Sequence, residues 1–423
     1  MSSYIIQGRN KLEGEVKISG SKNASLPILA ATILNAGTTK LYNVPNIHDV
    51  QKMLEILELL GCKIKRKENK IIIDSSKVKN YEIPEHLMRE MRSSVVLAGS
   101  LIGKHKKAIF SYPGGCDIGA RPIDLHLKSF EKLGINIIEN YGKIECKCDK
   151  IVGVKINLDF PSVGATENTM LAACLGEGVT TISNAAREPE IIDLQNFLNR
   201  MGAKIKGAGT NIIEITGVKT LKDIDYNIMS DRIEAGTFLV AGAVTGGNIV
   251  INNITSNCIE PIIHKLEEAN CKIKIEKNAI ELQAPKRLKA VDIKTMPYPG
   301  FPTDMQSVFG ACMTVAKGTT VIVENIFENR YKYTQELIRM GAKITTEGRT
   351  AIIKGTKKLQ GAKVKSTDLR GGAAMVIAGL VANRNNRGWR NSLYIKRLWK
   401  IWRKTIKFRS KNIYEKGRRK RLV

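Results

Sequence analysis

The chain has 423 residues, of which 43% are hydrophobic, and it carries a formal net charge of +28 at pH 7. The hydrophobic content excludes an intrinsically disordered protein, and the length is enough for two or three domains with cores of their own. The first residues, MSSYIIQGRN, lack the charged start and apolar core of a signal peptide, and no apolar run approaches the about 18 residues of a membrane span.

The first predicted helix begins near Lys22, in the run SKNASLPILAA, and this kind of opening occurs six times along the chain. Each opening has a polar or charged start and continues as a helix rich in small residues. The six openings begin near residues 21, 91, 164, 231, 303 and 368. Because small side chains let helices approach closely, we expect these six helices to be buried.

The polar groups at these openings are candidates for binding anions, because the first N–H groups of a helix are unpaired and its dipole is positive there. The groups are Lys22, Asn23, Arg92, Asp231, Arg232, Asp304 and Arg370. The alternative for any one of them is a purely structural role in helix capping. Six similar helix ends that converge would favour an anion site.

A closing pattern follows each opening except the last: a helix ends at Gly or Asn, and an alternating strand such as KIKI comes next. The Gly or Asn positions, spaced by 68 to 73 residues, are Gly61, Gly134, Gly202, Asn270 and Gly341. These residue types adopt the left-handed conformation that ends many helices. The repeat therefore predicts an α/β chain built from six similar units.

The segment SYPGGCDIGARPIDLH, residues 111–126, stands out from this repeat. Its glycines and prolines exclude a regular helix or strand, so it is predicted to be a loop that carries the thiol of Cys116 beside Arg121 and Asp124. The alternative is a surface loop with an incidental cysteine. The eight cysteines show no paired spacing typical of a metal site, which favours reduced thiols in a cytoplasmic protein.

The last 40 residues differ in composition from the rest of the chain. Residues 384–423 contain 16 Lys or Arg, one acid and all three tryptophans. The sixth closing pattern is expected near residue 409 but is missing, and one-base-shifted codons for 403–413 can spell it. We therefore hypothesise that the reading frame slips near Asn383. The alternative is a genuine nucleic-acid-binding arm, because such arms use Arg, Lys and Trp.

Several runs together resemble the UDP-N-acetylglucosamine 1-carboxyvinyltransferases, which are enolpyruvyl transferases of early peptidoglycan synthesis. The runs are SGSKNASLPIL, PGGCDIGARPIDLH, SVGAT, NAAREPEI, DRIEAGTF, FPTDMQ, FENR and DLR. The resemblance extends from the N-terminus to about Asn383. The family's RGYE stretch, whose arginine contacts phosphoenolpyruvate, is absent, and Arg397 has no matching context.

The resemblance implies a two-domain inside-out α/β barrel, the enolpyruvyl transferase fold, with three units in each domain and the active site in the cleft between domains. Residues 21–229 would form the domain that carries the Cys116 loop. Residues 1–20 and 230–383 would form the second domain, and 384–423 would be an aberrant basic tail. Neither a cofactor nor a metal is implied, and the expected partners are the two small substrates, without nucleic acid or membrane.

The implied reaction moves the enolpyruvyl group of phosphoenolpyruvate to the 3′-hydroxyl of UDP-N-acetylglucosamine and releases phosphate. By the same resemblance Cys116 would be the general acid, Asp304 the general base, and Lys22, Arg121 and Arg370 the cations that hold the anionic substrates. The residues implied to bind substrate are Lys22, Asn23, Arg92, Arg121, Pro122, Ile123, Asp124, Leu125, Phe160, Pro161, Ser162, Val163, Asp304, Ile326 and Arg370. Asp231 and Glu188 would either organise the cleft or be structural.

Two other functions stay open from the sequence. The sister family, which makes 5-enolpyruvylshikimate 3-phosphate, shares the fold but lacks the cysteine loop. An inactive frameshifted homologue, or one that binds nucleic acid through its tail, is the second alternative.

Overall fold

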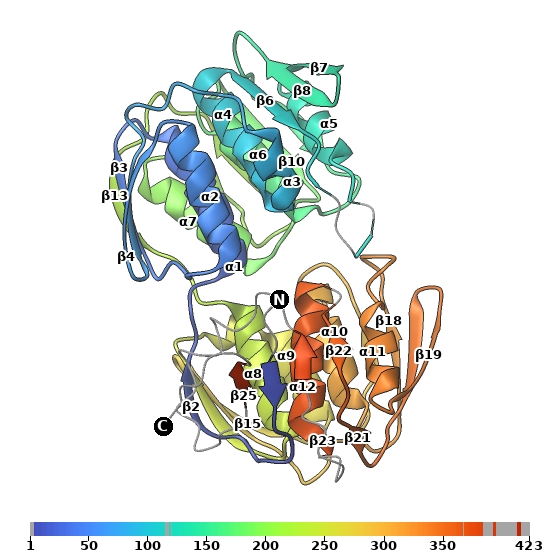
Figure 1. The fold of residues 1–423 in the computed structure, drawn as a ribbon. Coiled ribbons are helices and arrows are strands. Elements are labelled where there is room, and N and C mark those ends of the chain that lie inside the picture. Colours follow the sequence, from blue (N-terminus) through green and yellow to red (C-terminus); the bar gives the residue numbers. More distant parts are fainter. Residues whose placement is uncertain are drawn as a thin grey trace. The chain divides into compact units, whose positions relative to one another are not determined.

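The computed structural model describes residues 4–114, 118–119, 121–366 and 368–383, together with two short strands at 392–394 and 413–415 (Figure 1). The chain divides into two compact units. We call Gly20–Cys116 and Arg121–Ser230 the N-unit, and Met1–Ser19, Asp117–Ala120 and Asp231–Val423 the C-unit. The predicted division into a domain of residues 21–229, a second domain of 1–20 and 230–383, and a basic tail of 384–423 stays a prediction.

The N-unit contains three sheets and an interior of helices. Its strands are β3 (Thr38–Tyr42), β4 (Lys63–Lys67), β5 (Lys70–Asp74), β6 (Lys107–Ser111), β7 (Asn136–Asn140), β8 (Lys143–Lys147), β9 (Lys155–Asn157), β10 (Val179–Ser183), β11 (Lys204–Lys206), β12 (Ile212–Thr216) and β13 (Ile224–Asn227). Its α-helices are α1 (Lys22–Ala31), α2 (His48–Leu59), α3 (Glu85–Glu90), α4 (Leu97–His105), α5 (Asp124–Lys132), α6 (Val163–Ala173) and α7 (Pro189–Arg200). The 3-10 helices η1 (Thr32–Leu34) and η2 (Arg92–Val96) adjoin α1 and α4.

The C-unit repeats this plan. Its helices are α8 (Arg232–Val244), η3 (Ser256–Cys258), α9 (Glu260–Glu268), α10 (Thr303–Met313), α11 (Tyr333–Arg339) and α12 (Leu369–Val381). Its strands are β1 (Tyr4–Ile6), β2 (Glu13–Lys17), β14 (Asn248–Asn252), β15 (Lys272–Glu276), β16 (Ala279–Gln283), β17 (Ile293–Lys294), β18 (Thr319–Val323), β19 (Lys343–Glu347), β20 (Thr350–Lys354), β21 (Leu359–Gln360), β22 (Val364–Lys365), β23 (Ala382–Asn383), β24 (Ser392–Tyr394) and β25 (Ile413–Glu415).

The sheets share one strand pattern, in which a parallel pair is extended by two antiparallel neighbours. The orders β13-β3-β5-β4, β11-β12-β10-β9, β15-β16-β14-β2 and β17-β18-β20-β19 all follow it. In the β6-β8-β7 sheet the parallel partner is reduced to a bridge between Glu82 and Ile109. The common pattern confirms the repeated α/β architecture.

The five predicted helix endings have the expected backbone geometry. Gly61, Gly134, Gly202, Asn270 and Gly341 all have positive φ angles, between 71° and 110°. Each follows the end of an outer helix, α2, α5, α7, α9 or α11, and precedes a strand. A residue with a Cβ is strained in this region, and glycine and asparagine tolerate it best.

The helices that follow the six openings form the cores of the units. Ten of the residues of α12 are buried, and α10 is buried from Met305 to its end. In the C-unit α8, α10 and α12 each contact the other two. In the N-unit a Cβ added at Gly99 of α4 would lie 2.4 Å from the carbonyl oxygen of Asn168 on α6. The predicted burial of the small-residue helices is confirmed.

The sixth sheet combines β1 near the N-terminus with β22, β24 and β25 from the last 60 residues of the chain. β1 pairs antiparallel with β24 and with β25, and β24 pairs parallel with β22. The closing segment expected near residue 409 and the proposed frame change after Asn383 otherwise lie outside the described residues. Within the part of the chain that the structure describes, no helix combines the length and apolarity needed to cross a membrane.

Candidate active site

The C-unit brings Asp304 together with two arginines. Arg330 Nη2 donates to Asp304 Oδ1 at 2.8 Å, and Arg370 Nη2 donates to Oδ2 at 2.6 Å. Arg330 is only 3% exposed, and it also donates to the carbonyl of Thr303 at 3.2 Å. Asp304 and Arg370 belong to the first turns of α10 and α12, so two predicted helix openings meet here.

The arginines keep Asp304 ionised. Burial by itself would raise the pKa of this carboxyl group, but the charges of Arg370 and Arg330 and their hydrogen bonds hold the pKa well below its usual range. Pro302 occupies the N-cap position of α10. The capping role considered for Asp304 is therefore wrong, and its carboxylate accepts hydrogen bonds from the two guanidinium groups instead.

A second carboxylate, Glu324, is hydrogen-bonded to Thr303, the residue before Asp304, and is completely buried. Its Oε1 accepts from the Thr295 hydroxyl at 2.9 Å and from the backbone N–H groups of Ile326 and Phe327 at 2.9 and 3.2 Å. Its Oε2 accepts from the Thr303 hydroxyl at 2.9 Å. Glu324 thus ties the loop after β18 to the end of β17 and to the start of α10.

Asp231 caps α8, as the structural alternative for this residue proposed. Its carboxylate accepts from the N–H groups of Ile233 and Glu234, both at 2.9 Å. Glu234 accepts from the N–H and the hydroxyl of Ser19, at 3.3 and 3.2 Å. Burial, and next the negative charge of Asp231, raises the pKa of Glu234 to about 8. Arg232 is nearly buried, with its guanidinium carbon 5.6 Å from the centre of the Tyr298 ring.

In the N-unit, Lys22 lies at the first position of α1, after the N-cap Ser21. Its Nζ is 2.7 Å from Asp49 Oδ2, at the first turn of α2. Both side chains are about one quarter exposed, so this cation is accessible while its position is fixed by an ion pair. Asn23 follows it and is half-buried.

Arg92 connects η2 to the segment before α5. Its guanidinium donates to the carbonyl of Arg121, and its Nη2 lies 3.4 Å from the carbonyl oxygen of Pro122. Arg121, Pro122 and Asp124 are exposed, whereas Ile123 is buried and Leu125 packs against the core. Arg92 is thus brought together with the predicted 121–125 run.

A neutral polar network underlies this segment. Asn168 Nδ2 is 2.7 Å from His126 Nδ1 and donates to the carbonyl of Val95 at 3.0 Å, while its Oδ1 accepts from Gly99 N–H at 2.7 Å. Since the amide donates to Nδ1, the ring proton belongs on Nε2. Burial, and next the charge of Arg92, lowers the pKa of His126 to about 4.

The predicted run from Phe160 to Val163 forms the start of α6. Ser162 caps the helix by accepting from the N–H of Ala165 at 3.3 Å, and the Phe160 side chain is 44% exposed. Pro161 and Val163 are half-buried. At the start of α7, Glu188 occupies the N-cap position without a capping hydrogen bond from its side chain.

Cys116 lies outside the described residues, so its predicted role stays a prediction. Two neighbours in the same loop, Ile118 and Gly119, are described within the C-unit. The carbonyl of Ile118 accepts from Asn329 N–H at 3.1 Å. The φ of Gly119 is +137°, a backbone conformation that favours glycine, and a Cβ there would lie 2.4 Å from a carboxylate oxygen of the flexible Glu328 side chain.

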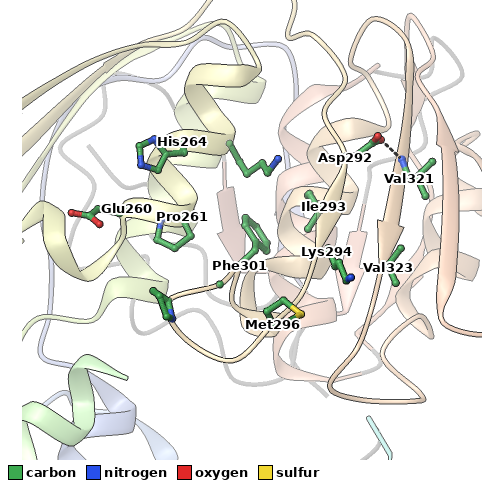
Figure 2. Close-up of a pocket in the computed structure, with 13 residues that line it drawn as sticks. Glu260, Pro261, His264, Asp292, Ile293, Lys294, Met296, Phe301, Val321 and Val323 are labelled. Atoms are coloured by element: carbon green, nitrogen blue, oxygen red, sulfur yellow. Dashed lines mark hydrogen bonds between the residues drawn. The ribbon is translucent and has the colours of Figure 1, made fainter. Parts of the chain in front are cut away.

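A hollow of about 580 Å³ lies elsewhere in the C-unit, between α9 and the β17–β18 edge (Figure 2). Figure 2 shows His264 and Pro261 on the helix side, Asp292 and Val321 on the strand side, and Phe301 between them. None of its lining residues is a predicted site residue. Among the described residues, no group of three His, Cys, Asp or Glu side chains is arranged to hold a metal ion.

The sequence interpretation gave no role to Arg330, Glu324 or the His126–Asn168 pair. Arg330 is part of the FENR run that carried the family resemblance, so this run was the signal for it. Glu324 and Asn168 lack such a signal, because isolated polar residues inside apolar runs do not reveal their partners.

Comparison with known proteins places these residues in a family context. The family model of EPSP synthase (3-phosphoshikimate 1-carboxyvinyltransferase) matches residues 6–396. The chain is 55% identical over 383 residues to UDP-N-acetylglucosamine 1-carboxyvinyltransferase 2 of Caldanaerobacter subterraneus subsp. tengcongensis, covering 90% of this chain and 92% of that one. It is 49% identical to the UDP-N-acetylglucosamine 1-carboxyvinyltransferase of Geobacter metallireducens, with the same coverage. The enolpyruvyl transferase NikO from Streptomyces tendae superposes with a TM-score of 0.82 at 20% identity, covering 93% of each chain, which confirms the predicted fold.

Proposed function

This chain belongs to the enolpyruvyl transferase family, and we infer that within it the chain is a UDP-N-acetylglucosamine 1-carboxyvinyltransferase. It transfers the enolpyruvyl group of phosphoenolpyruvate to the 3′-hydroxyl of UDP-N-acetylglucosamine in peptidoglycan synthesis. The observation that carries this conclusion is the similarity to such transferases along nine tenths of both chains.

The reaction is an addition followed by an elimination. A proton adds to the CH₂ carbon of phosphoenolpyruvate while the sugar oxygen bonds to the neighbouring carbon and gives up its own proton. The methyl group then loses a proton, the C–O bond to phosphate breaks, and the vinyl ether and inorganic phosphate remain. The protein must therefore supply one acid, one base and fixed cations for two anionic substrates.

We assign the cationic roles to Lys22, Arg121 and Arg370. Lys22 begins a helix, and Arg370 is in the first turn of another, where the helix dipole also favours anions. Lys22 is partly exposed, and Arg121 is exposed. Arg92 would bind the nucleotide sugar together with the exposed groups of the 121–125 and 160–163 runs.

We assign to Asp304 the role of base for the sugar 3′-hydroxyl. While two guanidinium groups hold its pKa well below the usual range, Asp304 is a strong hydrogen-bond acceptor but a weak base. If the anionic groups of phosphoenolpyruvate engage Arg370, that charge is shared with the substrate and the basicity of Asp304 rises. Substrate binding would then activate the base at the point where it is needed.

We assign to Cys116 the role of acid for the CH₂ carbon. The pKa of a free thiol is about 8.5, and cations such as Arg121 would lower it, so this group suits proton donation near neutral pH.

The experiment that tests this function is phosphate release from phosphoenolpyruvate with UDP-N-acetylglucosamine or with shikimate 3-phosphate as acceptor. Release with the nucleotide sugar alone supports the proposal. Release with shikimate 3-phosphate alone would overturn it in favour of the sister activity, which the description of the matched family model makes the second candidate.

A parallel assay addresses residues 384–423, which we propose to arise from a change of reading frame. The aligned part of the Caldanaerobacter relative spans 383 of the 423 residues. A chain with the restored frame is expected to release phosphate faster, because it regains the arginine of the missing RGYE stretch. Equal rates for both chains, together with gene reads that contain no shifted frame, would contradict this.

We also propose that the protein acts in the cytoplasm. Its seven described cysteines, of which five are buried, are all free thiols. Free thiols are usual in a reducing compartment. Recovery of the enzyme in a membrane-free cytoplasmic fraction would support the proposal, and recovery from the periplasm would contradict it.

A further inference from the structure

Glu324 is a buried charge that the proposed reaction does not use. It lies at the end of β18 with no exposed surface, and its carboxylate accepts four hydrogen bonds. A carboxylate in such a position is costly unless each lone pair finds a donor. The four donors come from three separate segments, each of which contributes to the candidate site or supports it.

The first segment is the start of α10. Glu324 Oε2 accepts from the hydroxyl of Thr303, the residue directly before Asp304. Arg330 holds the same turn from the other side, through the Thr303 carbonyl and the Asp304 carboxylate. The first turn of α10, which carries Asp304, is therefore held by two groups: Glu324 through Thr303, and Arg330 through Thr303 and Asp304.

The second segment is the loop after β18. Glu324 Oε1 accepts from the N–H groups of Ile326 and Phe327, which bends this loop back over its own start. Ile326 is a predicted contact of the nucleotide sugar, and the loop continues to Arg330. The carboxylate thus joins this loop to the start of α10, where Asp304 lies.

The third segment is the end of β17, where Thr295 is fully buried. Its hydroxyl donates to Glu324 and accepts from Asn325 N–H at 2.9 Å. No predicted site residue is adjacent to Thr295 in the sequence. Its hydrogen bond therefore holds Glu324 in place without involving a residue of the proposed reaction. This makes Thr295 a structural counterpart to Thr303.

We propose that Glu324 is a positioning residue, which holds Asp304 and the Ile326 loop in register for attack by the sugar hydroxyl. This rests on the proposed function. A misplacement of about 1 Å at a reacting group can cost a hundredfold in rate, so a clamp of this kind has a measurable effect.

The test compares Thr303→Val with Thr295→Val, because each removes one hydroxyl that is 2.9 Å from Glu324. Thr303→Val is expected to lower kcat/KM for the nucleotide sugar about tenfold with a small change in Tm. Thr295→Val also leaves Asn325 N–H without its acceptor, so it is expected to lower Tm more and kcat/KM less. A purely structural role for Glu324 predicts that activity follows Tm in both variants, and that result would overturn the proposal.

Glu324 itself gives the second comparison. Glu324→Leu removes every acceptor and is expected to lower kcat/KM about a hundredfold. Glu324→Gln keeps an oxygen that accepts from the two N–H groups, so it is expected to retain most of the kcat/KM of the unchanged chain. Equal losses in the two variants would count against positioning by hydrogen bonds.

A readout without turnover separates this proposal from the proposed function. Amide exchange at Ile326 and Phe327 is expected to be faster in Glu324→Leu than in the unchanged chain, since their acceptor is gone. Unchanged exchange there would overturn the positioning role. Absence of phosphate release by the unchanged chain would instead count against the proposed function alone.

Discussion

The two units hold their candidate charges in different ways. In the C-unit, the carboxylate of Asp304 is paired with two guanidinium groups, those of Arg330 and Arg370, so these three groups keep a positive charge before any substrate is present. In the N-unit, Arg92 is spent on backbone carbonyls, Arg121 and Asp124 are exposed, and the buried support beneath them is the neutral His126. The Asp304 cluster of the C-unit therefore holds buried charges that contact one another, whereas the 121–125 segment of the N-unit presents exposed polar groups next to a neutral, buried histidine; the ion pair of Lys22 with Asp49 is a separate, partly exposed feature of the N-unit.

This contrast bears on the chemistry we assign to each unit. A base whose strength depends on two arginines responds to the arrival of an anion, because the anion competes for the same guanidinium groups. Exposed loops supported by hydrogen-bonded neutral groups bind without a change in buried charge.

Replacing Asp304 breaks the paired charges of the C-unit. Asp304→Ala is expected to lower turnover by about 10²–10⁴-fold, the range for loss of a general base. It also leaves the nearly buried Arg330 without its anion, which is expected to cost about 2–3 kcal/mol of unfolding free energy, less than for a fully buried pair because Asp304 is 28% exposed. Steady-state kinetics and urea unfolding measure the two effects.

The matched control is Asp292→Asn. Asp292 accepts from Val321 N–H at 2.8 Å in the same unit, but it has no arginine partner among the described ion pairs. The turnover of the Asp292→Asn variant is expected to differ from that of the unchanged chain by less than twofold. If Asp304→Ala keeps activity within the same margin, Asp304 is not the base.

Cys116→Ser tests the cysteine loop, which is not part of this comparison between the two units. A serine is a far weaker acid than a thiol, so turnover at neutral pH is expected to fall by about 10²–10⁴-fold. The family resemblance also implies that fosfomycin alkylates this cysteine, so it should add mass to the peptide that contains Cys116. Burial raises the pKa of Cys62, Cys146 and Cys174 to about 12, so these thiols are expected to stay unmodified. Unchanged turnover would remove Cys116 from the mechanism.

The neutral support of the N-unit predicts loss of stability in acid. The pKa of His126 falls from 6.5 in the unfolded chain to about 4 in the folded one, so the unfolded state binds a proton first as the pH drops. The neutral His126 therefore contributes about 3 kcal/mol to the free energy of unfolding above pH 6.5, and this contribution is lost as the pH falls towards 4. Urea unfolding at pH 7 and pH 4.5 should show that the free energy of unfolding of His126→Gln depends less on pH than that of the unchanged chain. His264→Gln, which changes a side chain that is 70% exposed, serves as the control and should behave like the unchanged chain.

The C-unit offers the opposite dependence at Glu234. Its pKa rises from 4.5 to about 8 on folding, so its favourable contribution is present below pH 4.5 and is lost as the pH rises through 8. Glu234→Gln keeps an acceptor for Ser19 and is expected to stabilise the protein at pH 8 by about 2 kcal/mol, with no gain at pH 4.5. A gain of equal size at both pH values would contradict the assigned pKa.

Much of the fold follows from local sequence. Gly61, Gly134, Gly202, Asn270 and Gly341 could be placed at helix ends because only a few residue types accept a positive φ, and all five have it. The buried small-residue helices could be recognised in the same way, since their composition permits close packing. Asp231 shows the limit of this reasoning, because a carboxylate at a helix start suits both capping and catalysis, and here it caps.

The candidate site was only partly accessible from sequence. The FENR and FPTDMQ runs indicated where Asp304 and Arg330 would lie along the chain, but not that their side chains pair. His126 and Asn168 are 42 residues apart, and Glu324 and Thr295 are 29 apart. Partners at such separations are brought together by the packing of helices and sheets, which no local pattern encodes.

The sequence by itself determined the six-unit α/β plan, the helix ends and the family. These depend on the periodicity of small, apolar and left-handed residues over short stretches, and that information is local. The tertiary structure alone decided which charges are paired, which carboxylate stays ionised between two arginines, and which one is buried among four hydrogen-bond donors. Protonation and position depend on groups distant in the chain, because burial and electric fields act through space rather than along the backbone.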